Sequence, residues 1–315
     1  SAFDALARQG VLVLSPDALS KLKDINHIVF DKTGTLTTGQ STVKDIRLFN
    51  DFSEQQALQA AYSLEIGSKH PLAAAFSDFS GPPLMLDSVR IEPGQGVQGV
   101  AQNIIWRLGK ADFAAPGRPD SGIWLSRDNV VLAHFLLDDP IKNGAASDLQ
   151  WIRRTGMHCH LLSGDGVERV AQVAEALAVE DWHARSTPQM KLEIVRRLQA
   201  GGGKVLMVGD GINDAPVMAQ ADVSMAMGSG AWLAQNNADV LLMNSRLKQI
   251  GLVFSVARHM QHLMRQNLQW AIAYNVIAVG IALSGFIHPG YAALGMAGSS
   301  LLVTLNALRI YKVTS

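Results

Sequence analysis

One ten-residue stretch, residues 28–37 with the sequence IVFDKTGTLT, constrains this chain more than any other. Its first three residues are apolar and partly β-branched, which is typical of a buried strand, and the glycine and hydroxyl residues that follow indicate a turn. Asp31 therefore stands at the carboxyl end of a strand, where an open α/β sheet places its ligand site. A carboxylate there can attack a phosphoryl group, with Lys32 and the hydroxyls and amides of the loop available to hold the transferred oxygens. The stretch predicts that Asp31 is a nucleophile.

Length and composition limit the classes of protein to consider. A chain of 315 residues suffices for two or more folded units. Its formal net charge is zero, so no overall field favours nucleic acid or an acidic partner, and we expect no nucleic-acid binding. The single cysteine, Cys159, excludes an internal disulfide framework and suits a reducing cytosol. The absence of an initiating Met, together with a start in mid-pattern, favours a fragment of a longer protein.

A second carboxylate-bearing turn follows a later apolar strand. After the apolar residues 205–208, the sequence GDGINDAP places Asp210 and Asp214 four residues apart, with Asn213 between them. Two carboxylates and an amide on a glycine-rich turn are what a hard, oxygen-preferring cation needs beside a phosphate. We expect Mg²⁺ on Asp210 and Asp31 with Asp214 nearby, and Asn213 in support of the phosphate.

These motifs carry a resemblance. DKTGTLT is the phosphorylation signature of the P-type ion-pumping ATPases, and GDGxNDxP follows in the order of that family, so the chain resembles it. The resemblance implies a HAD-like, doubly wound α/β phosphorylation domain with an inserted α+β nucleotide-binding domain. Related phosphatases carry a second Asp where this chain has Thr33, a difference that suits a longer-lived phosphoenzyme. Ser163, Gly164 and Asp165 stand where the family has Thr-Gly-Asp, and Lys191 matches its phosphate-site lysine.

The inserted segment is similar to the nucleotide-binding domain of the heavy-metal branch of that family. Glu65, then His70 in a Ser-x-His-Pro motif, and later Gly94 and Gly96 in GQGVQG match the branch's pattern, in which they hold adenine and leave room for phosphates. Taken alone, a His-Pro pair or a GxGxxG is more typical of a turn. The resemblance implies that ATP binds at these four residues. Lys69 departs from the Glu found in many members.

The last quarter of the chain has a different character. Residues 268–287 contain no charged side chain, and residues 291–308 form a second uncharged run after a His-Pro-Gly turn. At about 1.5 Å per residue, such a run can span a hydrocarbon core of roughly 30 Å. Lys and Arg residues flank the pair on both outer sides, which places those ends in the cytosol. The pattern predicts a C-terminal transmembrane helical hairpin, with two buried helices of a soluble protein as the alternative.

Polar residues in these runs indicate the transported ion. Inside a membrane, such groups mark either helix packing or an ion route. Tyr274 and Asn275, followed by Met296 and Ser300, resemble the copper-selective members, and a thioether suits monovalent copper. The Lys and Asp that zinc- and cadmium-moving relatives place in these helices do not occur here. By resemblance, these four residues bind Cu(I) with cysteines of an earlier helix.

The tripeptide His158-Cys159-His160 looks like a metal-binding cluster. It follows an amphipathic helical pattern and reads as part of a strand. Strand alternation sends the two histidines to one face and the cysteine to the other, so the three cannot converge on one ion. We therefore interpret the tripeptide as structural.

Together, the patterns predict four parts: 1–40 (linker and first part of the phosphorylation domain), 41–136 (nucleotide-binding domain), 137–247 (rest of the phosphorylation domain) and 248–315 (two transmembrane helices). The predicted function is ATP-driven translocation of a heavy-metal cation, Cu(I), across a bacterial inner membrane, with the catalytic domains in the cytoplasm. The resemblance implies as partners ATP, membrane lipid, the actuator domain and earlier helices of the same pump, and a copper chaperone. Two alternatives stay open: a membrane-tethered phosphatase of the same superfamily and a non-enzymatic nucleotide- or metal-binding regulatory module.

Overall fold

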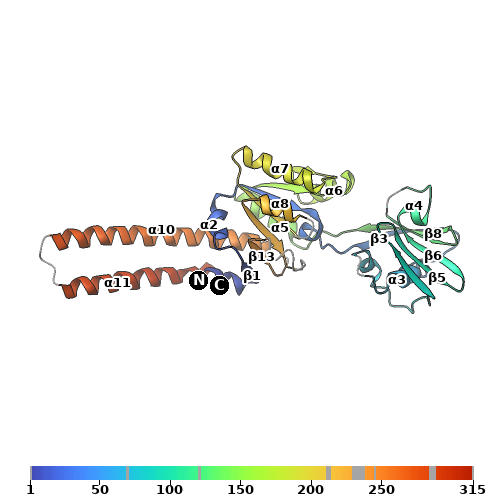
Figure 1. The fold of residues 1–315 in the computed structure, drawn as a ribbon, viewed down its shortest axis with the longest axis horizontal. Helices are drawn as coiled ribbons and strands as arrows, with labels where there is room; N and C mark the ends of the chain where they lie inside the picture. Colours follow the sequence, from blue (N-terminus) through green and yellow to red (C-terminus); the bar gives the residue numbers. More distant parts are fainter. Residues whose placement is uncertain are drawn as a thin grey trace. The chain divides into compact units, whose positions relative to one another are not determined.

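The chain is divided into two compact units, which Figure 1 shows in a computed structural model. Unit 1 comprises Ser1–Leu36 and Asn143–Ser315, and unit 2 comprises Thr37–Lys142. The structure describes residues 2–68, 71–119, 122–210, 214–228, 238–244, 246–283 and 289–313.

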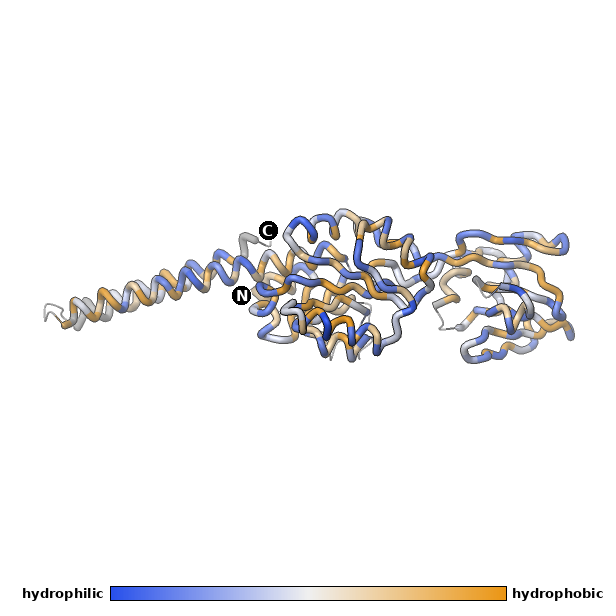
Figure 2. Tube along the Cα trace, turned by 90° about the horizontal axis from the view of Figure 1, so that it is seen from above, coloured by the Kyte–Doolittle hydropathy of each residue, from blue (hydrophilic) through white to orange (hydrophobic). Residues whose placement is uncertain are grey.

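Unit 1 is built on a mostly parallel sheet. In the part of the chain that the structure describes, its strands are β1 (Val11–Val13), β2 (His27–Asp31), β9 (His158–Leu162), β10 (Asp181–His183), β11 (Val205–Gly209), β12 (Val223–Met227) and β13 (Val240–Leu242). Their order across the sheet is β1-β13-β12-β11-β2-β9-β10, and neighbours run parallel except β1 and β13. The central strands are apolar and buried, as expected when both faces are covered. Figure 2 shows hydrophobic segments of the chain in the middle of unit 1.

Helices alternate with these strands. They are α1 (Ala2–Ala7), α2 (Ala18–Lys21), η1 (Leu22–Asp24), α5 (Ala145–Arg154), α6 (Val167–Ala176), α7 (Pro188–Ala200) and α8 (Ala215–Gln220). The start of α7 follows from its sequence, because the Thr187 side chain accepts a hydrogen bond from the Met190 amide and Pro188 occupies the first helical position. This start places Lys191 in the first turn of α7.

The parallel strands bring three sequence motifs to one edge of the sheet. Asp31, the last residue of β2, pairs in register with Leu162 at the end of β9. Val208 of β11 pairs with Phe30 on the other side of β2. Ser163 and Asp210 directly follow β9 and β11. The carboxyl ends of the three strands therefore share one edge, as the sequence predicted.

Unit 2 contains an antiparallel sheet with strand order β3-β8-β7-β6-β5-β4. The strands are β3 (Thr42–Leu48), β4 (Ser88–Glu92), β5 (Gly96–Ala101), β6 (Ile104–Gly109), β7 (Ile123–Arg127) and β8 (Val130–Asp138). The helical elements are α3 (Glu54–Glu65), η3 (Pro71–Phe76) and α4 (Ala111–Ala114). An α3 capping box fixes the helix start, because the Gln56 amide donates to the Ser53 hydroxyl and the Ser53 amide donates to the Gln56 side chain.

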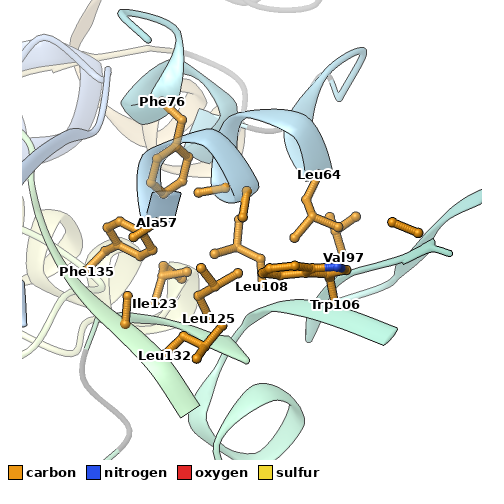
Figure 3. Packing of buried hydrophobic residues seen from close by; sticks show 14 residues of the cluster. Ala57, Leu64, Phe76, Val97, Trp106, Leu108, Ile123, Leu125, Leu132 and Phe135 are labelled. Atoms are coloured by element: carbon orange, nitrogen blue, oxygen red, sulfur yellow. The ribbon is translucent and has the colours of Figure 1, made fainter. Parts of the chain in front are cut away.

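The core of unit 2 lies between α3, η3 and the sheet (Figure 3). The rings of Phe76 and Phe135 meet edge to face, with centroids 5.0 Å apart, and Leu64 near the end of α3 packs in the same cluster as Val97 and Trp106. Glu65 is the next residue and the last of α3.

Unit 2 extends beyond the predicted segment 41–136 at both ends. Thr37 forms an isolated antiparallel bridge with Ile141. The Asp139 carboxylate accepts hydrogen bonds from the Thr37 hydroxyl at 2.5 Å and from the Gly39 amide at 2.9 Å. These contacts join residues about a hundred positions apart, which no local pattern could reveal.

The C-terminal region forms a helical hairpin of α10 (Lys248–Leu283) and α11 (Pro289–Ala307), followed by η4 (Leu308–Val313), and Figure 1 shows α10 and α11 side by side. Hydrogen bonds cross between them: Trp270 Nε1 donates to Ser299 Oγ at 3.2 Å, and Asn306 Nδ2 donates to Asn267 Oδ1 at 2.8 Å. The first part of α10 belongs to the core of unit 1, where side chains such as Val253 and Phe254 are buried.

The hairpin corrects one expectation. Among the described residues, no helix combines the length and the apolar character needed to cross a membrane. The predicted helical pair is therefore present, but the predicted spans are not found in it. Polar side chains such as Gln269, Asn275 and Asn306 lower the mean hydropathy of the two helices, and the predicted run 268–287 enters residues 284–288, which lie outside the described ranges.

Candidate active site

The site is organised around Asp31 at the carboxyl end of β2. Asp31 is 7% exposed, Lys191 is 6% exposed and Asp214 is 2% exposed. The Lys191 ammonium donates to Asp31 Oδ1 at 2.5 Å and to Asp214 Oδ1 at 2.9 Å. Asp214 directly precedes α8 and Lys191 lies at the start of α7, so three elements converge on one buried ammonium. The structure thus brings together three residues that the sequence placed in separate motifs.

The carboxylates of this cluster outnumber its one ammonium group. Burial raises the pKa of the Asp31 carboxyl to about 7, since the opposing effect of Lys191 is offset by Asp214 and Asp210. Burial alone would lower the pKa of Lys191, but Asp31 and Asp214 outweigh it and raise that pKa. One ammonium therefore faces more negative charge than it can neutralise.

The donor set suits a divalent cation. Asp210 lies close to the phosphorylation loop, because a Cβ added to Gly34 would be 3.7 Å from Asp210 Cβ. With Asp31, Asp210 and Asp214 against Lys191, the cluster offers the oxygen ligands and excess negative charge that Mg²⁺ prefers. Within the described ranges, however, no three His, Cys, Asp or Glu side chains are arranged as a metal site. The predicted residue Asn213 lies outside those ranges.

A second ion pair joins two further motifs. Lys32 Nζ lies 2.8 Å from Asp165 Oδ2, and the Lys32 side chain is nearly fully buried. The Asp165 amide donates to Ser163 Oγ at 3.1 Å. Ser163 is buried, whereas Gly164 and Thr33 are exposed. The pair connects the loop after β2 to the loop after β9, so all of these residues lie at the same edge of the sheet.

Sequence reasoning gave no separate role to Thr35. This residue is fully buried in the loop after Asp31, and its hydroxyl has no hydrogen-bond partner in the structure. A buried hydroxyl without a partner is costly, so it indicates a group that a bound molecule satisfies. The signal was available in the second Thr of the DKTGT motif.

Unit 2 contains a separate pocket of about 520 Å³. Glu65 enters it from the end of α3, and Glu65 Oε2 is buried without a hydrogen-bond partner. The pocket walls are otherwise mostly apolar, which suits a flat heteroaromatic ring with one polar edge. Its lining residues are Glu65, Ser68, Leu72, Phe76, Ile91, Gly94, Gln95, Gly96, Val97, Leu108, Gly109, Lys110 and Ile123.

Two predicted glycines shape this pocket. Gly94 has a positive φ of 74°, which favours glycine, and no atom lies within 4 Å of where its Cβ would be. Gly96 is constrained differently, because a Cβ there would lie 2.2 Å from the Leu108 carbonyl oxygen. The structure therefore brings Glu65, Gly94 and Gly96 to one pocket, while His70 lies outside the described residues.

The four residues expected to bind copper lie on the hairpin. Tyr274 lies against α11, since a Cβ added to Gly295 would be 3.0 Å from its hydroxyl oxygen. Met296 is 67% exposed, and Asn275 and Ser300 are exposed as well. Tyr274 therefore lies next to Gly295, the neighbour of Met296 in the sequence. For the described side chains, no contact is found that joins Tyr274, Asn275, Met296 and Ser300 into one site.

The sequence of this chain matches a known family. A family model described as haloacid dehalogenase-like hydrolase covers residues 25–222, which is well over half of the chain. The chain belongs to this family. As a haloacid dehalogenase-like hydrolase, it carries Asp31, Asp210 and Asp214 within the matched region, and domains of this kind bind Mg²⁺.

Individual curated proteins are similar to nearly the whole of this chain. The nitrogen fixation protein FixI of Rhizobium leguminosarum bv. viciae is 37% identical over 314 residues, 97% of this chain and 41% of that protein. A copper-transporting ATPase of Helicobacter felis is 33% identical over 308 residues, 93% of this chain and 42% of that protein. The chain spans about two fifths of the length of these curated relatives.

A solved structure also resembles this chain over nearly its whole length. A zinc-transporting PIB-type ATPase in the E2.Pi state matches with a TM-score of 0.79 and 30% identity over 98% of this chain and 54% of that chain. The two units are thus the phosphorylation and nucleotide-binding domains of a heavy-metal P-type ATPase. The matches include both copper- and zinc-named proteins, so they do not decide the metal.

Proposed function

We propose that the chain is the catalytic part of a pump that moves a heavy-metal cation, Cu(I), across a bacterial inner membrane, and that Asp31 carries the phosphate taken from ATP. The observation that supports this proposal is the buried Asp31–Lys191–Asp214 cluster at the carboxyl edge of the parallel sheet. A nucleophilic carboxylate needs its phosphoryl acceptor oxygen positioned and the charge around it offset. The cluster supplies both conditions.

Each side chain has a part in phosphoryl transfer. Asp31 attacks the γ-phosphorus, and the phosphorus–oxygen bond to ADP breaks as the new bond to the carboxylate oxygen forms. Lys191 offsets the charge on the transferred oxygens, and Ser163, with Thr35, offers hydroxyl donors to them. Lys32 is held by Asp165 and fixes the loop that carries Thr33 and Gly164. The absence of a carboxylate at Thr33 leaves no second acid to speed hydrolysis.

Magnesium is proposed to bind at the same site. Asp31, Asp210 and Asp214 would hold it, with Asn213 in support of the phosphate, and the ion would offset the charge that one lysine leaves unbalanced. The nucleotide is proposed to bind in unit 2. Glu65 Oε2 would accept a hydrogen from the adenine edge, and the glycine turn at Gly94 and Gly96 would leave room for phosphates, with His70 beside them.

The hairpin is proposed to contact the membrane and the rest of the pump. Apolar side chains such as Leu268, Val276 and Leu301 are more than half exposed on α10 and α11. Such a surface is stable when lipid or the earlier helices of the same pump cover it. Tyr274, Asn275, Met296 and Ser300 would contribute to the Cu(I) route, and a copper chaperone is the proposed source of the ion.

The central test is covalent labelling of the full chain with γ-labelled ATP and Mg²⁺. The wild-type chain should retain acid-stable, alkali-labile phosphate, and Asp31→Asn should lower its formation by about 10⁴-fold or more, as removal of a nucleophile does. Asp45→Asn is the matched control, because Asp45 is an exposed carboxylate of β3. Its labelling should equal that of wild type.

The same experiment separates the alternatives. Rapid release of phosphate from small esters without ATP would favour a tethered phosphatase, and ATP binding without any labelling would favour a regulatory module. The metal is tested in the complete pump by measuring which ion stimulates ATP hydrolysis, with Met296→Ala as the variant. Stimulation by Zn²⁺ rather than Cu(I), unchanged in that variant, would contradict the copper assignment.

A further inference from the structure

A histidine cluster lies at the amino edge of the parallel sheet, opposite Asp31. His27 is the first residue of β2, His158 the first of β9 and Asp181 the first of β10. Because these strands are parallel, their amino ends lie side by side, and His27 pairs in register with His158. The tripeptide that resembled a metal motif thus gains a third histidine from β2, while Cys159 is buried.

Hydrogen bonds connect the cluster in a line. His160 Nδ1 lies 2.6 Å from Asp181 Oδ2, and His160 Nε2 lies 2.9 Å from His27 Nδ1. At the other end, His183 Nε2 lies 3.2 Å from Asp181 Oδ1. The line joins β2, β9 and β10 through side chains, in addition to their backbone ladders.

The donors and acceptors in this line are fixed. A carboxylate only accepts, so His160 Nδ1–H donates to Asp181. A neutral His160 then has a bare Nε2, so His27 Nδ1–H donates to it. Neither ring is free to turn away, since His160 is 5% exposed and a Cβ added to Gly203 would lie 2.6 Å from His27 Cδ2. Gly203, the last of three consecutive glycines, leaves the space that the His27 ring occupies.

Protons change this arrangement in two steps. One proton on His160 places hydrogens on both of its nitrogens, so its bond to His27 survives only if His27 moves its own hydrogen to Nε2. A second proton, on His27, sets two N–H groups against each other across 2.9 Å and breaks the bond. The His158 ring stacks on this pair, with its centroid 5.2 Å from that of His27.

The surrounding charges do not remove this repulsion. Asp181 is the nearest anion, but it already accepts from His160 and His183. Glu180 and Arg153 also line the adjacent cavity of about 530 Å³, and Arg153 is held by the carbonyls of Leu177 and Ala178. Burial, followed by the neighbouring histidines, lowers the pKa of His27, and burial also lowers that of His160 although Asp181 opposes it.

We propose that the His27–His160–Asp181 line is a proton-sensitive latch: at neutral pH it ties the amino ends of β2 and β9 together, and acidification releases them. Release affects the strand that carries Asp31, because His27 and Asp31 are the two ends of β2. Acid therefore loosens the catalytic strand from the edge opposite the reaction. The latch concerns the folded state of unit 1 and does not depend on the transported ion or on phosphorylation.

Hydrogen exchange on the full chain at pH 7.5 and 5.5 tests the latch, with rates corrected for intrinsic pH dependence. In wild type, amides of residues 27–31 and 158–162 should lose protection by about tenfold at the lower pH. His27→Asn keeps a donor near the Nδ1 position but does not titrate, so the loss should fall to less than about threefold. His262→Asn, an exposed histidine on α10, is the matched control and should behave as wild type.

Amides of β5 and β6 in unit 2 should show no difference between these chains. Equal loss of protection in wild type and His27→Asn would overturn the proposal. Should His27→Asn fold poorly, NMR titration of the wild-type histidine Cε1 protons replaces it. Coupled titration of His27 and His160 below their usual value of about 6.5 supports the latch, and independent titration at or above that value contradicts it. Protection of the same amides by Zn²⁺, lost in His27→Asn, would identify a metal site and also overturn it.

Discussion

The candidate sites of the two units consist of different kinds of groups. Unit 1 places charged side chains at the carboxyl ends of parallel strands, where Asp31, Asp214 and Lys191 are each less than a tenth exposed. Unit 2 forms its pocket from apolar walls and close backbone approach at Gly96, with Glu65 as the buried carboxylate among its lining residues. The first site depends on charge balance, whereas the second depends on shape. A substitution in unit 1 should therefore affect folding and chemistry together, and one in unit 2 should affect binding alone.

The largest effect is expected from Lys191→Met. This change leaves Asp31 and Asp214 facing each other without their shared ammonium, and removal of one partner from a buried ion pair costs about 3–5 kcal/mol. The free energy of unfolding, measured by urea titration without Mg²⁺, should fall by that amount. Labelling with ATP should fall as well, by about 10²-fold or more.

Lys204→Met is the matched control for this variant. Lys204 pairs with Asp222 at 2.8 Å, but its side chain is 55% exposed, so water and salt weaken the pair. We expect little change in stability. If both variants lost similar stability, burial would not distinguish the Lys191 cluster, and the contrast between the two units would lose its basis.

The difference between the units also explains what the sequence could reveal. Asp31 and Asp214 were identified from motifs because charged chemistry requires particular residue types on particular turns, and Lys191 was matched through the family resemblance. The parallel sheet followed from the same strands. Glu65 was named from a resemblance alone, and its buried, partnerless oxygen became evident only once α3 and the sheet had packed.

Features that need strand order were missed. Strand alternation within residues 158–160 could not bring in His27, which lies 131 positions before His158 and reaches it through the pairing of β2 with β9. Asp139 similarly lies about a hundred positions from Thr37 and Gly39. The hairpin helices were predicted, but among the described residues no helix is long and apolar enough to cross a membrane.

A second test uses the raised pKa of Asp31, about 7. The unfolded carboxyl titrates near 3.9, so between these values the folded chain binds the extra proton and stability falls as the pH rises. From pH 5.5 to 7.5, Asp31 should contribute a loss of about 2 kcal/mol without Mg²⁺, integrated over that shift. The quantity to measure at each pH is the difference in the free energy of unfolding between wild type and Asp31→Asn. The histidine cluster has the opposite pH dependence, but both chains share it, so it cancels in this difference.

Added Mg²⁺ should reverse this loss at pH 7.5 in wild type, because a cation that binds only the folded carboxylates stabilises them by mass action. Unit 2 serves as the internal reference for this test. Hydrogen exchange in β5 and β6 should not depend on the titration of Asp31. An Asp31→Asn chain whose stability retains the full wild-type slope would show that other groups carry the pH dependence.

The smallest effect is expected at Glu65, where the chain allows the contrast between charge and shape to be measured within one helix. Glu65→Gln keeps the size of the side chain but exchanges one acceptor oxygen for a donor, so a bound adenine loses one hydrogen bond, worth about 1–2 kcal/mol. ATP affinity, measured by calorimetry on the full chain, should fall by about tenfold. The free energy of unfolding should not fall, because Glu65 Oε2 has no partner to lose.

Glu54→Gln is the control for this variant. Glu54 is exposed in the first turn of the same helix, and its substitution should change neither quantity. A loss of stability in Glu65→Gln with unchanged affinity would mean that this carboxylate is a structural group, and the pocket of unit 2 would then need another polar contact to orient a nucleotide.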